Sequence, residues 1–144
     1  MVYLESIRYA RRVAFWTVVS GQRVPMELTS LGRAYLASAH PDELSRLMSK
    51  FSHRRRGQWT KLKSDIERSI CDVHEQGWCA ASWQPEVVAV STPLKTADAV
   101  YALNMSLSTS EPTAAVARSI VPKLLALKAE ITSALERSAL EVTL

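Results

Sequence analysis

Residues 100–107, VYALNMSL, carry no charge on either face of the β-strand that their alternating pattern predicts. One face presents the large side chains of Tyr101, Leu103, Met105 and Leu107, and the other presents Val100, Ala102, Asn104 and Ser106. We expect the first face to pack against a helix. The second face combines small side chains with neutral polar groups, which is typical of a ligand pocket. The strand is therefore expected to lie in a sheet with helices on its faces.

A long helix that can cover the large apolar face follows this strand. From Thr113 onward, apolar side chains recur at three- and four-residue spacing, namely Val116, Ile120, Leu124, Leu127, Ile131 and Leu135. Pro122 falls early in this segment, where it is expected to cause only a bend. We expect the helix to cover one face of the sheet.

Further strands are predicted near the start of the chain and before residue 100. The β-branched and aromatic segments at residues 2–9, 11–19, 78–83 and 87–94 favour strands. The short region at Ala10 is interpreted as the turn between the first two segments, and Gln84-Pro85-Glu86 separates the last two.

Three helices are expected between the two groups of strands. The first follows Pro25 and is capped by Thr29 or Ser30, and the second begins at His40-Pro41, because proline suits the first turn of a helix. The third carries Leu62, Ile66, Ile70 and Val73 and ends at Gly77. The order ββαααβββα predicts an α+β fold with helices against an antiparallel sheet.

The composition indicates a single domain spanning residues 1–144. Hydrophobic residues make up 47% of the chain and charged residues 22%, the balance of a folded soluble protein. No apolar run of about 18 residues predicts a membrane span. The two cysteines, Cys71 and Cys79, form no disulfide framework, so we expect a cytoplasmic protein.

The net charge of +4 does not predict direct DNA binding. The basic residues are scattered, and the run Arg54-Arg55-Arg56 is more typical of a solvated loop than of a phosphate-binding element. No helix-turn-helix precedes the first predicted strand. We therefore expect contact with DNA to require a domain that is absent from this chain.

The face of small side chains on strand 100–107 extends onto the neighbouring strand through Val87, Ala89 and Ser91. Opposite this face we place the start of the helix at Ser30. Free backbone N–H groups and the helix dipole favour a carboxylate or phosphate at such a position. The sequence therefore predicts a site for an anionic ligand between the helix start and the sheet.

Two other interpretations of these polar groups stay open. Asn104 and Ser106 could instead satisfy buried backbone groups, which always need partners. The start of the helix could be satisfied by the side chain of Thr29 or Ser30, which is the commoner arrangement.

The segment 23–38, RVPMELTSLGRAYLAS, followed by 41–48, PDELSRLM, resembles the signature of the IclR family. In that signature a proline-containing strand end leads into an Ala/Ser/Thr-x-x-Gly-Lys/Arg-Ala helix and then into an acidic helix that begins with proline. Other blocks of the family match along nearly the whole chain: VYLESIR near the start, the run from Ile66 to Trp78, STPL at 91–94 and ALNMSLS at 102–108.

The resemblance implies a GAF-like or PAS-like domain, with an antiparallel sheet of five to six strands and helices packed on its faces. Such a domain senses a ligand for a bacterial transcription regulator: it binds a small organic acid and controls the arrangement of subunits in a homodimer or tetramer. A winged helix-turn-helix normally precedes it. Matching positions give the implied ligand residues, with Ser30 and Leu31 as backbone donors, Trp16 and Val24 as apolar walls, and Val87, Ala89, Asn104 and Ser106 on the sheet side.

The chain departs from the family pattern beside this site. Where the family has acidic residues that can reach the ligand, this chain has Ala81-Ser82-Trp83-Gln84, so Ala81 is expected to line the site without a polar anchor. Where the family often has Gly-hydrophobic-Arg-Cys, this chain has Glu86-Val87-Val88-Ala89. These departures favour an aromatic or other apolar acid as the ligand. The alternative is a structural or dimerisation module whose pocket has degenerated.

Catalytic and metal-binding patterns are weak. Cys71, His74 and Cys79 lie close in sequence, but a structural zinc site needs four ligands, so we expect Cys71 to be a buried small side chain. His40 and His53 have no nucleophile or carboxylate partner at a recognised spacing. With only four glycines the chain has no glycine-rich phosphate loop. We expect neither an enzyme nor a bound cofactor or metal.

Overall fold

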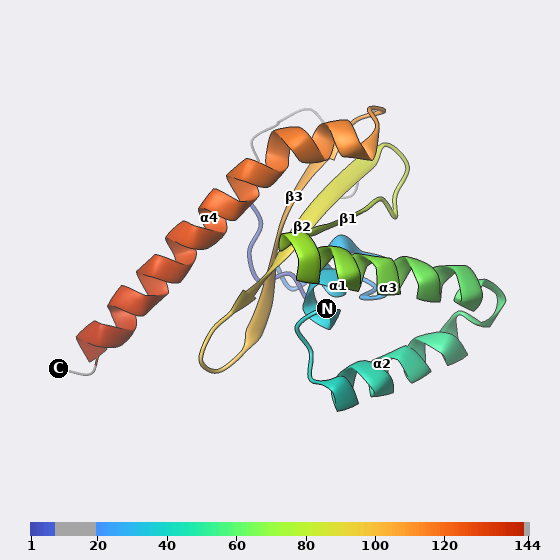
Figure 1. The fold of residues 1–144 in the computed structure, drawn as a ribbon, viewed down its shortest axis with the longest axis horizontal. Helices are drawn as coiled ribbons and strands as arrows, with labels where there is room; N and C mark the ends of the chain where they lie inside the picture. The colour runs from blue at the N-terminus through green and yellow to red at the C-terminus, as the bar shows by residue number, and fades with distance from the viewer. Residues whose placement is uncertain (8–19, 143–144) are drawn as a thin grey trace.

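The computed structural model describes residues 1–7 and 20–142, the last four of these by their backbone alone. Figure 1 shows the order of the elements along the chain. They are α1 (Ser30–Leu36), α2 (Pro41–Arg54), the 3-10 turn η1 (Arg56–Gln58), α3 (Trp59–Gln76), β1 (Cys79–Ala81), β2 (Val87–Lys95), β3 (Val100–Ser108) and α4 (Thr113–Val142). The expected α+β arrangement is confirmed.

The strands form an antiparallel sheet in the order β1-β2-β3, so the described residues contain three strands of one sheet. The expected count of five to six is not confirmed. The two strands predicted near the start of the chain overlap residues 8–19, which lie outside the described part, and Val2 forms only an isolated bridge with Arg23. β1 is shorter than the predicted 78–83.

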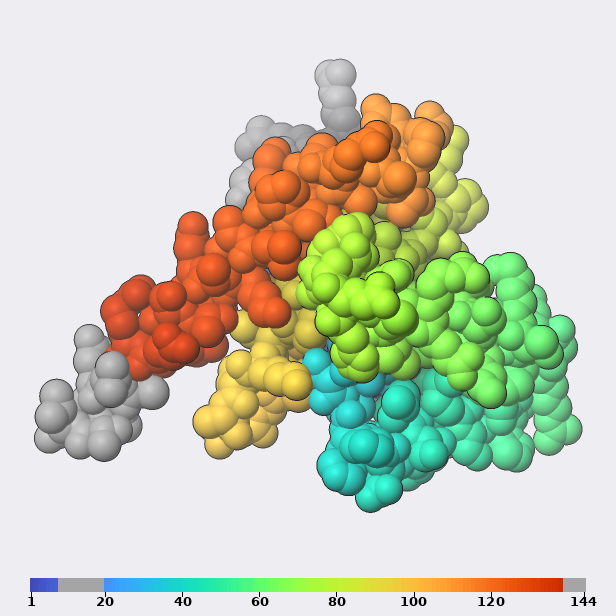
Figure 2. Space-filling view, viewed as in Figure 1, coloured from blue at the N-terminus to red at the C-terminus, as the bar shows by residue number. Residues whose placement is uncertain are grey.

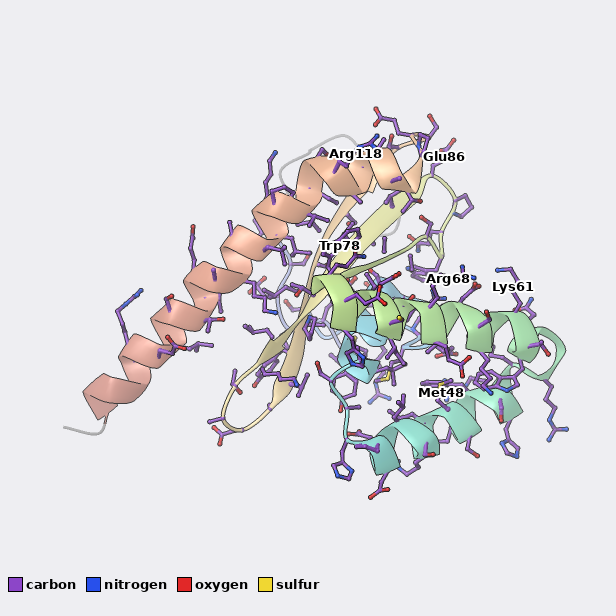
Figure 3. The ribbon with its side chains drawn as sticks, in the orientation of Figure 1. Met48, Lys61, Arg68, Trp78, Glu86 and Arg118 are labelled. Atoms are coloured by element: carbon purple, nitrogen blue, oxygen red, sulfur yellow. The ribbon has the colours of Figure 1, made fainter. Side chains whose placement is uncertain are left out.

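One face of the sheet packs against the first half of α4 (Figure 1). Val88 and Val90 of β2 are buried against Val116, Ile120 and Leu124 of α4. Further side chains that pack on this cluster are Leu103, Met105 and Trp78, the last labelled in Figure 3 just beyond α3. The prediction that the large apolar face of strand 100–107 meets the long helix is thus confirmed at its centre, although Tyr101 and Leu107 at its ends are exposed.

The other face of the sheet lies against α1 and α3. Ala34 of α1, Val73 of α3 and Cys79 of β1 are buried together, and Ala102 of β3 packs on them. Further from the sheet, α2 lies along α3 over a separate apolar cluster of Leu36, Phe51, Leu62 and Ile66. Met48, labelled on α2 in Figure 3, packs against that cluster.

The helix ends follow the predicted signals. Thr29 caps α1 by accepting a hydrogen bond from the Gly32 N–H, and Pro41 occupies the first position of α2. Gly77 ends α3 with a φ of 85°, a left-handed conformation that glycine adopts without a Cβ penalty.

Only the first half of α4 covers the sheet. The buried residues among its described side chains are Val116, Ala117, Ile120 and Leu124. Leu127 and Leu135 are 39% and 44% exposed, so the expectation that the whole apolar stripe covers a sheet face is wrong beyond Leu124. Figure 1 shows this second half extending away from the sheet. None of the described helices combines the length and the apolar composition that a membrane span requires.

Candidate ligand-binding face

The register of the three strands places most of the predicted sheet-side residues in two rows on the face that packs against α1. One row runs Cys79, Ser91, Asn104 across β1, β2 and β3, and the next runs Ala81, Ala89, Ser106. Directly paired residues in antiparallel strands point to the same face. We call the first the inner row and the second the outer row. Val87 lies one position further out, paired with Ser108.

The start of α1 sits on the inner row. The hydroxyl oxygens of Ser30 and Ser91 lie 2.7 Å apart in a hydrogen bond, and both side chains are buried. The Cys79 thiol donates to the Ser30 carbonyl at 3.5 Å. Burial raises the pKa of the Cys79 thiol to about 12, so this thiol stays protonated at neutral pH. These contacts confirm the predicted position of the helix opposite the sheet, and they leave no space between Ser30 and Ser91.

The direction of α1 makes its N-terminus point at the outer row. Ser30 lies at Ser91, which is paired with Asn104, whereas Ala34 lies in the cluster that contacts Ala102, two residues earlier in β3. The helix therefore runs from Asn104 toward Ala102, and its first turn faces back toward Ser106. A ligand at the outer row would meet backbone N–H groups end-on.

Two N–H groups of this first turn have no acceptor in the described part of the chain. The Thr29 hydroxyl accepts from the Gly32 N–H at 3.1 Å, and the Arg33 N–H bonds to the Thr29 carbonyl. The N–H groups of Ser30 and Leu31 are left without a described partner. The capping interpretation is therefore correct for Gly32, while the predicted donors at Ser30 and Leu31 have no acceptor among the described residues.

Asn104 and Ser106 are also without hydrogen bonds from their side chains among the described residues. Asn104 is half-buried and Ser106 is exposed. Neither side chain satisfies a described buried backbone group, which was the alternative interpretation of these residues. Both polar groups can therefore serve a ligand.

Of the remaining predicted wall residues, the structure describes Val24 and Val87. Val24 is buried next to the bridge that joins Val2 and Arg23, and its N–H donates to the Met1 carbonyl. Val87 is half-buried at the start of β2. Trp16 lies outside the described residues.

Sequence reasoning missed Glu27, which is fully buried in the loop before α1. Its Oε1 accepts a hydrogen bond from Arg55 Nε at 3.0 Å and lies 3.8 Å from Arg54, whereas its Oε2 has no partner in the described structure. The prediction that the arginine run is a solvated loop is wrong for Arg55, which lies against this carboxylate. An acidic residue inside the apolar segment before the helix is the signal that could have indicated a buried ion pair.

Arg33 ties the same loop to α3. Its Nε donates to the Glu27 carbonyl at 3.3 Å and one terminal nitrogen donates to Ser69 at 3.3 Å. Burial, opposed by nearby Asp65, lowers the pKa of Arg33 from its ordinary value. The loop before α1 is thereby held between α1, α3 and the end of α2.

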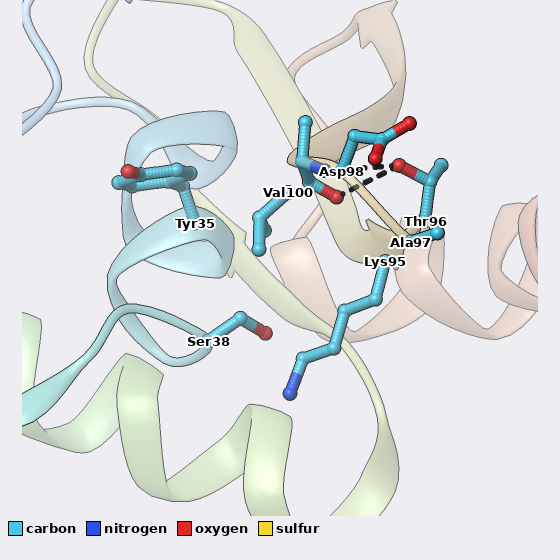
Figure 4. A pocket seen from close by; sticks show the side chains of 8 residues that line it. Tyr35, Ser38, Lys95, Thr96, Ala97, Asp98 and Val100 are labelled. Atoms are coloured by element: carbon cyan, nitrogen blue, oxygen red, sulfur yellow. Dashed lines mark hydrogen bonds between the residues drawn. The ribbon is translucent and has the colours of Figure 1, made fainter.

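An open hollow lies at the other end of α1, away from the two rows. It measures about 540 Å³ and lies between the end of α1 and the turn that joins β2 to β3 (Figure 4). Its lining includes Tyr35, Ser38, Lys95 and Asp98, none of which the sequence predicted as a ligand residue. The Thr96 hydroxyl in its wall is bonded to the Ala99 backbone, as the dashed lines in Figure 4 show.

The cysteines and histidines do not form a common cluster. Cys71 is exposed and bonds to Glu75, so the expectation that it is buried is wrong, while Cys79 is buried. His74 Nε2 lies 2.8 Å from the Ala37 carbonyl. Among the described residues, no three His, Cys, Asp or Glu side chains are placed to share a metal ion.

A comparison with protein families decides the relationship that these features indicate. The family described as bacterial transcriptional regulator IclR, C-terminal, matches residues 1–133. The chain belongs to the IclR family. This family consists of transcription regulators, not enzymes. No curated protein matches the sequence.

Solved structures of IclR-family regulators share the fold. An IclR family transcriptional regulator from Brucella abortus superposes with a TM-score of 0.78 at 23% identity, over 94% of this chain and 52% of that one. This chain thus spans about half the length of that relative. A double mutant of the inducer-binding domain of the PobR transcription factor from Acinetobacter, in complex with 3-hydroxybenzoic acid, gives a TM-score of 0.64 at 17% identity, over 85% and 73% of the two chains. An IclR homologue from Microbacterium hydrocarbonoxydans, in complex with 4-hydroxybenzoate, gives 0.62 at 14% identity, over 85% and 52%.

Proposed function

We propose that this chain is the effector-binding domain of a transcription regulator and that it binds a small organic acid, aromatic or otherwise apolar. The ligand lies on the outer row, with its carboxylate at the first turn of α1. The observation that carries this proposal is the pair of N–H groups at Ser30 and Leu31, which have no acceptor among the described residues and lie at the end of α1 nearest an uncharged row of small side chains.

The chemistry of the face fits such a ligand. Backbone N–H groups at a helix start attract an anion, although a helix of seven residues has only a short dipole. Asn104 and Ser106 offer neutral polar groups that can meet a hydroxyl on the ligand. Ala81 and Ala89 are buried beside the exposed Ser106, and their small side chains make the row apolar at its centre. Relatives of the same fold are complexed with hydroxybenzoates.

The domain would act as one part of a larger regulator. Binding would favour one arrangement of subunits in a homodimer or tetramer, because a ligand shifts an equilibrium only by its difference in affinity for the two states. A separate domain, a winged helix-turn-helix in the pattern of the family, would contact DNA. Such a regulator acts in the cytoplasm, where bacterial DNA lies.

A structural module with a degenerated pocket is the second candidate. The direct contact between Ser30 and Ser91 favours it, because this contact closes the inner end of the face. The absence of a carboxylate at the 81–84 segment favours it too. Under this alternative the domain dimerises but binds no acid.

A thermal-shift screen separates the two candidates. Benzoate, 3-hydroxybenzoate and 4-hydroxybenzoate are compared with benzyl alcohol, which has the ring but no carboxylate. A true ligand at about 100 times its dissociation constant stabilises the folded state by about 2.7 kcal/mol. We expect stabilisation by at least one acid and none by the alcohol.

The variant Ser106→Leu locates the site. Ser106 is exposed, so leucine there leaves the core intact but covers the outer row. We expect the acid to lose its stabilising effect on this variant and to keep it on Ser64→Leu, a matched change at an exposed serine of α3. Equal stabilisation of both variants would show that the acid binds elsewhere, and no stabilisation of the parent by any acid would favour the degenerated module.

A further inference from the structure

The face of α4 that packs on the sheet continues past the end of the sheet as an apolar stripe. The buried side chains Ile120 and Leu124 are followed on the same side of the helix by Leu127, Ile131 and Leu135, at three- and four-residue spacing. Leu127 and Leu135 are 39% and 44% exposed. We call residues 127–138 the distal segment of α4.

Among the described residues, only Lys128, near the start of the distal segment, forms a hydrogen bond from this segment to another element. Lys128 Nζ donates to Thr92 Oγ1 at 3.3 Å, and beyond Lys128 no described hydrogen bond or ion pair joins α4 to another element. Figure 2 shows the segment standing clear of the other described elements on the face in view. The segment continues a helix whose first half is already packed on the sheet, so what it lacks is cover for its apolar side chains and not a helix nucleus. The exposed stripe is therefore a surface that a partner can bury.

The charges beside the stripe are self-complementary. Glu130 and Arg137 lie seven residues apart, two helical turns, on the same flank, and neither forms an ion pair with a described residue. When two such helices lie antiparallel about a two-fold axis near Ala134, Glu130 of each copy comes opposite Arg137 of the other. The symmetry makes this pair twice, as an interface between identical patches requires.

The surface between these charges is hollowed and made of small residues. A hollow of about 610 Å³ is lined by Leu127, Glu130, Ile131, Ala134 and Arg137, with Ala129 and Ser133. Small side chains at the centre let a second helix approach closely, and Leu127 and Ile131 supply the apolar contact.

We propose that the distal segment of α4 pairs antiparallel with the same segment of a second copy of this chain. Leu127, Ile131 and Ala134 form the seam, and Glu130 and Arg137 form two flanking ion pairs across it. This names a surface for the assembly that the proposed function needs. It stands on α4 alone, so its failure would leave binding at the outer row untouched.

Charge reversal in the complete 144-residue chain tests the pairing. Analytical ultracentrifugation of the parent should show a dimer. In Glu130→Arg and in Arg137→Glu each copy meets like charges at both pairs, so we expect the dissociation constant of each homodimer to rise about tenfold or more. An equimolar mixture of the two variants restores both pairs, so a heterodimer should form with nearly the parental affinity.

Two further variants test whether the pairing uses this side of α4. Glu136→Arg changes a charge on the opposite side of α4 and should leave the dimer intact, whereas Ile131→Glu, at the seam, should give a folded monomer by circular dichroism. A parent that stays monomeric up to about 1 mM, far above the dissociation constant of a stable dimer, overturns the proposal. So does a dimer that ignores both reversals, because it must use another surface or another kind of partner contact.

Discussion

At the scale of single residues, Glu27 anchors the loop that leads into α1 through its contacts with Arg33 and Arg55. A buried carboxylate is costly unless it is paired and hydrogen-bonded, and one oxygen of Glu27 is held by Arg55 while the other has no described partner. The same residue offers its carbonyl to Arg33. The position of the loop before α1, and with it the N–H groups of Ser30 and Leu31, depends on these contacts.

Replacing Glu27 should therefore destabilise the fold. Glu27→Ala leaves the arginines without their anion, and we expect a loss of about 2–3 kcal/mol in the free energy of unfolding, because Arg55 is partly exposed and water compensates in part. Urea denaturation measures the change. Glu67→Ala, at an exposed pair with Lys63 on α3, should cost no more than about 1 kcal/mol. Equal losses for the two variants would contradict the buried role of Glu27.

The two thiols should differ sharply in reactivity. The pKa of Cys79 is raised to about 12 by burial, and its thiol bonds to the Ser30 carbonyl. The pKa of exposed Cys71 is raised too, by its hydrogen bond to Glu75, so its labelling should quicken as pH rises toward that pKa. At pH 8 we expect iodoacetamide to modify Cys71 slowly and Cys79 only after unfolding. Mass spectrometry of digested protein checks this, and modification of native Cys79 at the rate of Cys71 would show that the start of α1 does not cover it.

At the scale of elements, the close approach of α1 to the loop before it depends on Gly32. A Cβ at this position would overlap the backbone of Met26. At Gly57 a Cβ would meet nothing within 4 Å. The two glycines therefore form a natural comparison.

Gly32→Ala should destabilise the domain by about 2–3 kcal/mol, since backbone and not a flexible side chain must move. Gly57→Ala should be neutral or slightly stabilising, because alanine restricts the unfolded chain. Thermal unfolding followed by circular dichroism gives both values. A Gly32→Ala protein as stable as the Gly57→Ala protein would mean that α1 and the loop are not in this contact.

Local signals in the sequence predicted most helix ends, whereas contacts between distant segments escaped it. Pro41 and Gly77 act on their own turns, so their effect is visible in the sequence. Periodicity showed which side of α4 is apolar but not where the sheet beneath it ends, which is why Leu127 and Leu135 were expected to be covered. The ion pair of Glu27 with Arg55 joins residues 28 positions apart and has no periodic signature.

The sequence predicted which residues face the candidate site but not how closely α1 approaches the sheet. Alternation along residues 100–107 identified the face of Asn104 and Ser106, and the family resemblance added Ser30 and Leu31. The contact between Ser30 and Ser91 sets how far α1 approaches the sheet, a distance that only tertiary packing fixes. That contact moved the expected position of the ligand to the outer row.

At the scale of the whole molecule, β2 lies between the two proposed surfaces. Its Ala89 and Ser91 belong to the ligand-binding face, and its Val88 and Val90 pack against α4. A ligand that moves β2 relative to α1 therefore also acts on the helix that carries the distal segment. Coupling of this kind requires the ligand to differ in affinity between two arrangements of the subunits.

The most direct test of the ligand-binding face is a titration of ¹⁵N-labelled protein with the acid that the thermal screen selects, followed by amide NMR. We predict saturable shifts of the Ser30 and Leu31 amide signals, because their N–H groups donate hydrogen bonds to the carboxylate. The Gly57 signal should not change. Saturable shifts confined to the hollow beside Tyr35 and Lys95, with Ser30 and Leu31 unmoved, would contradict the account.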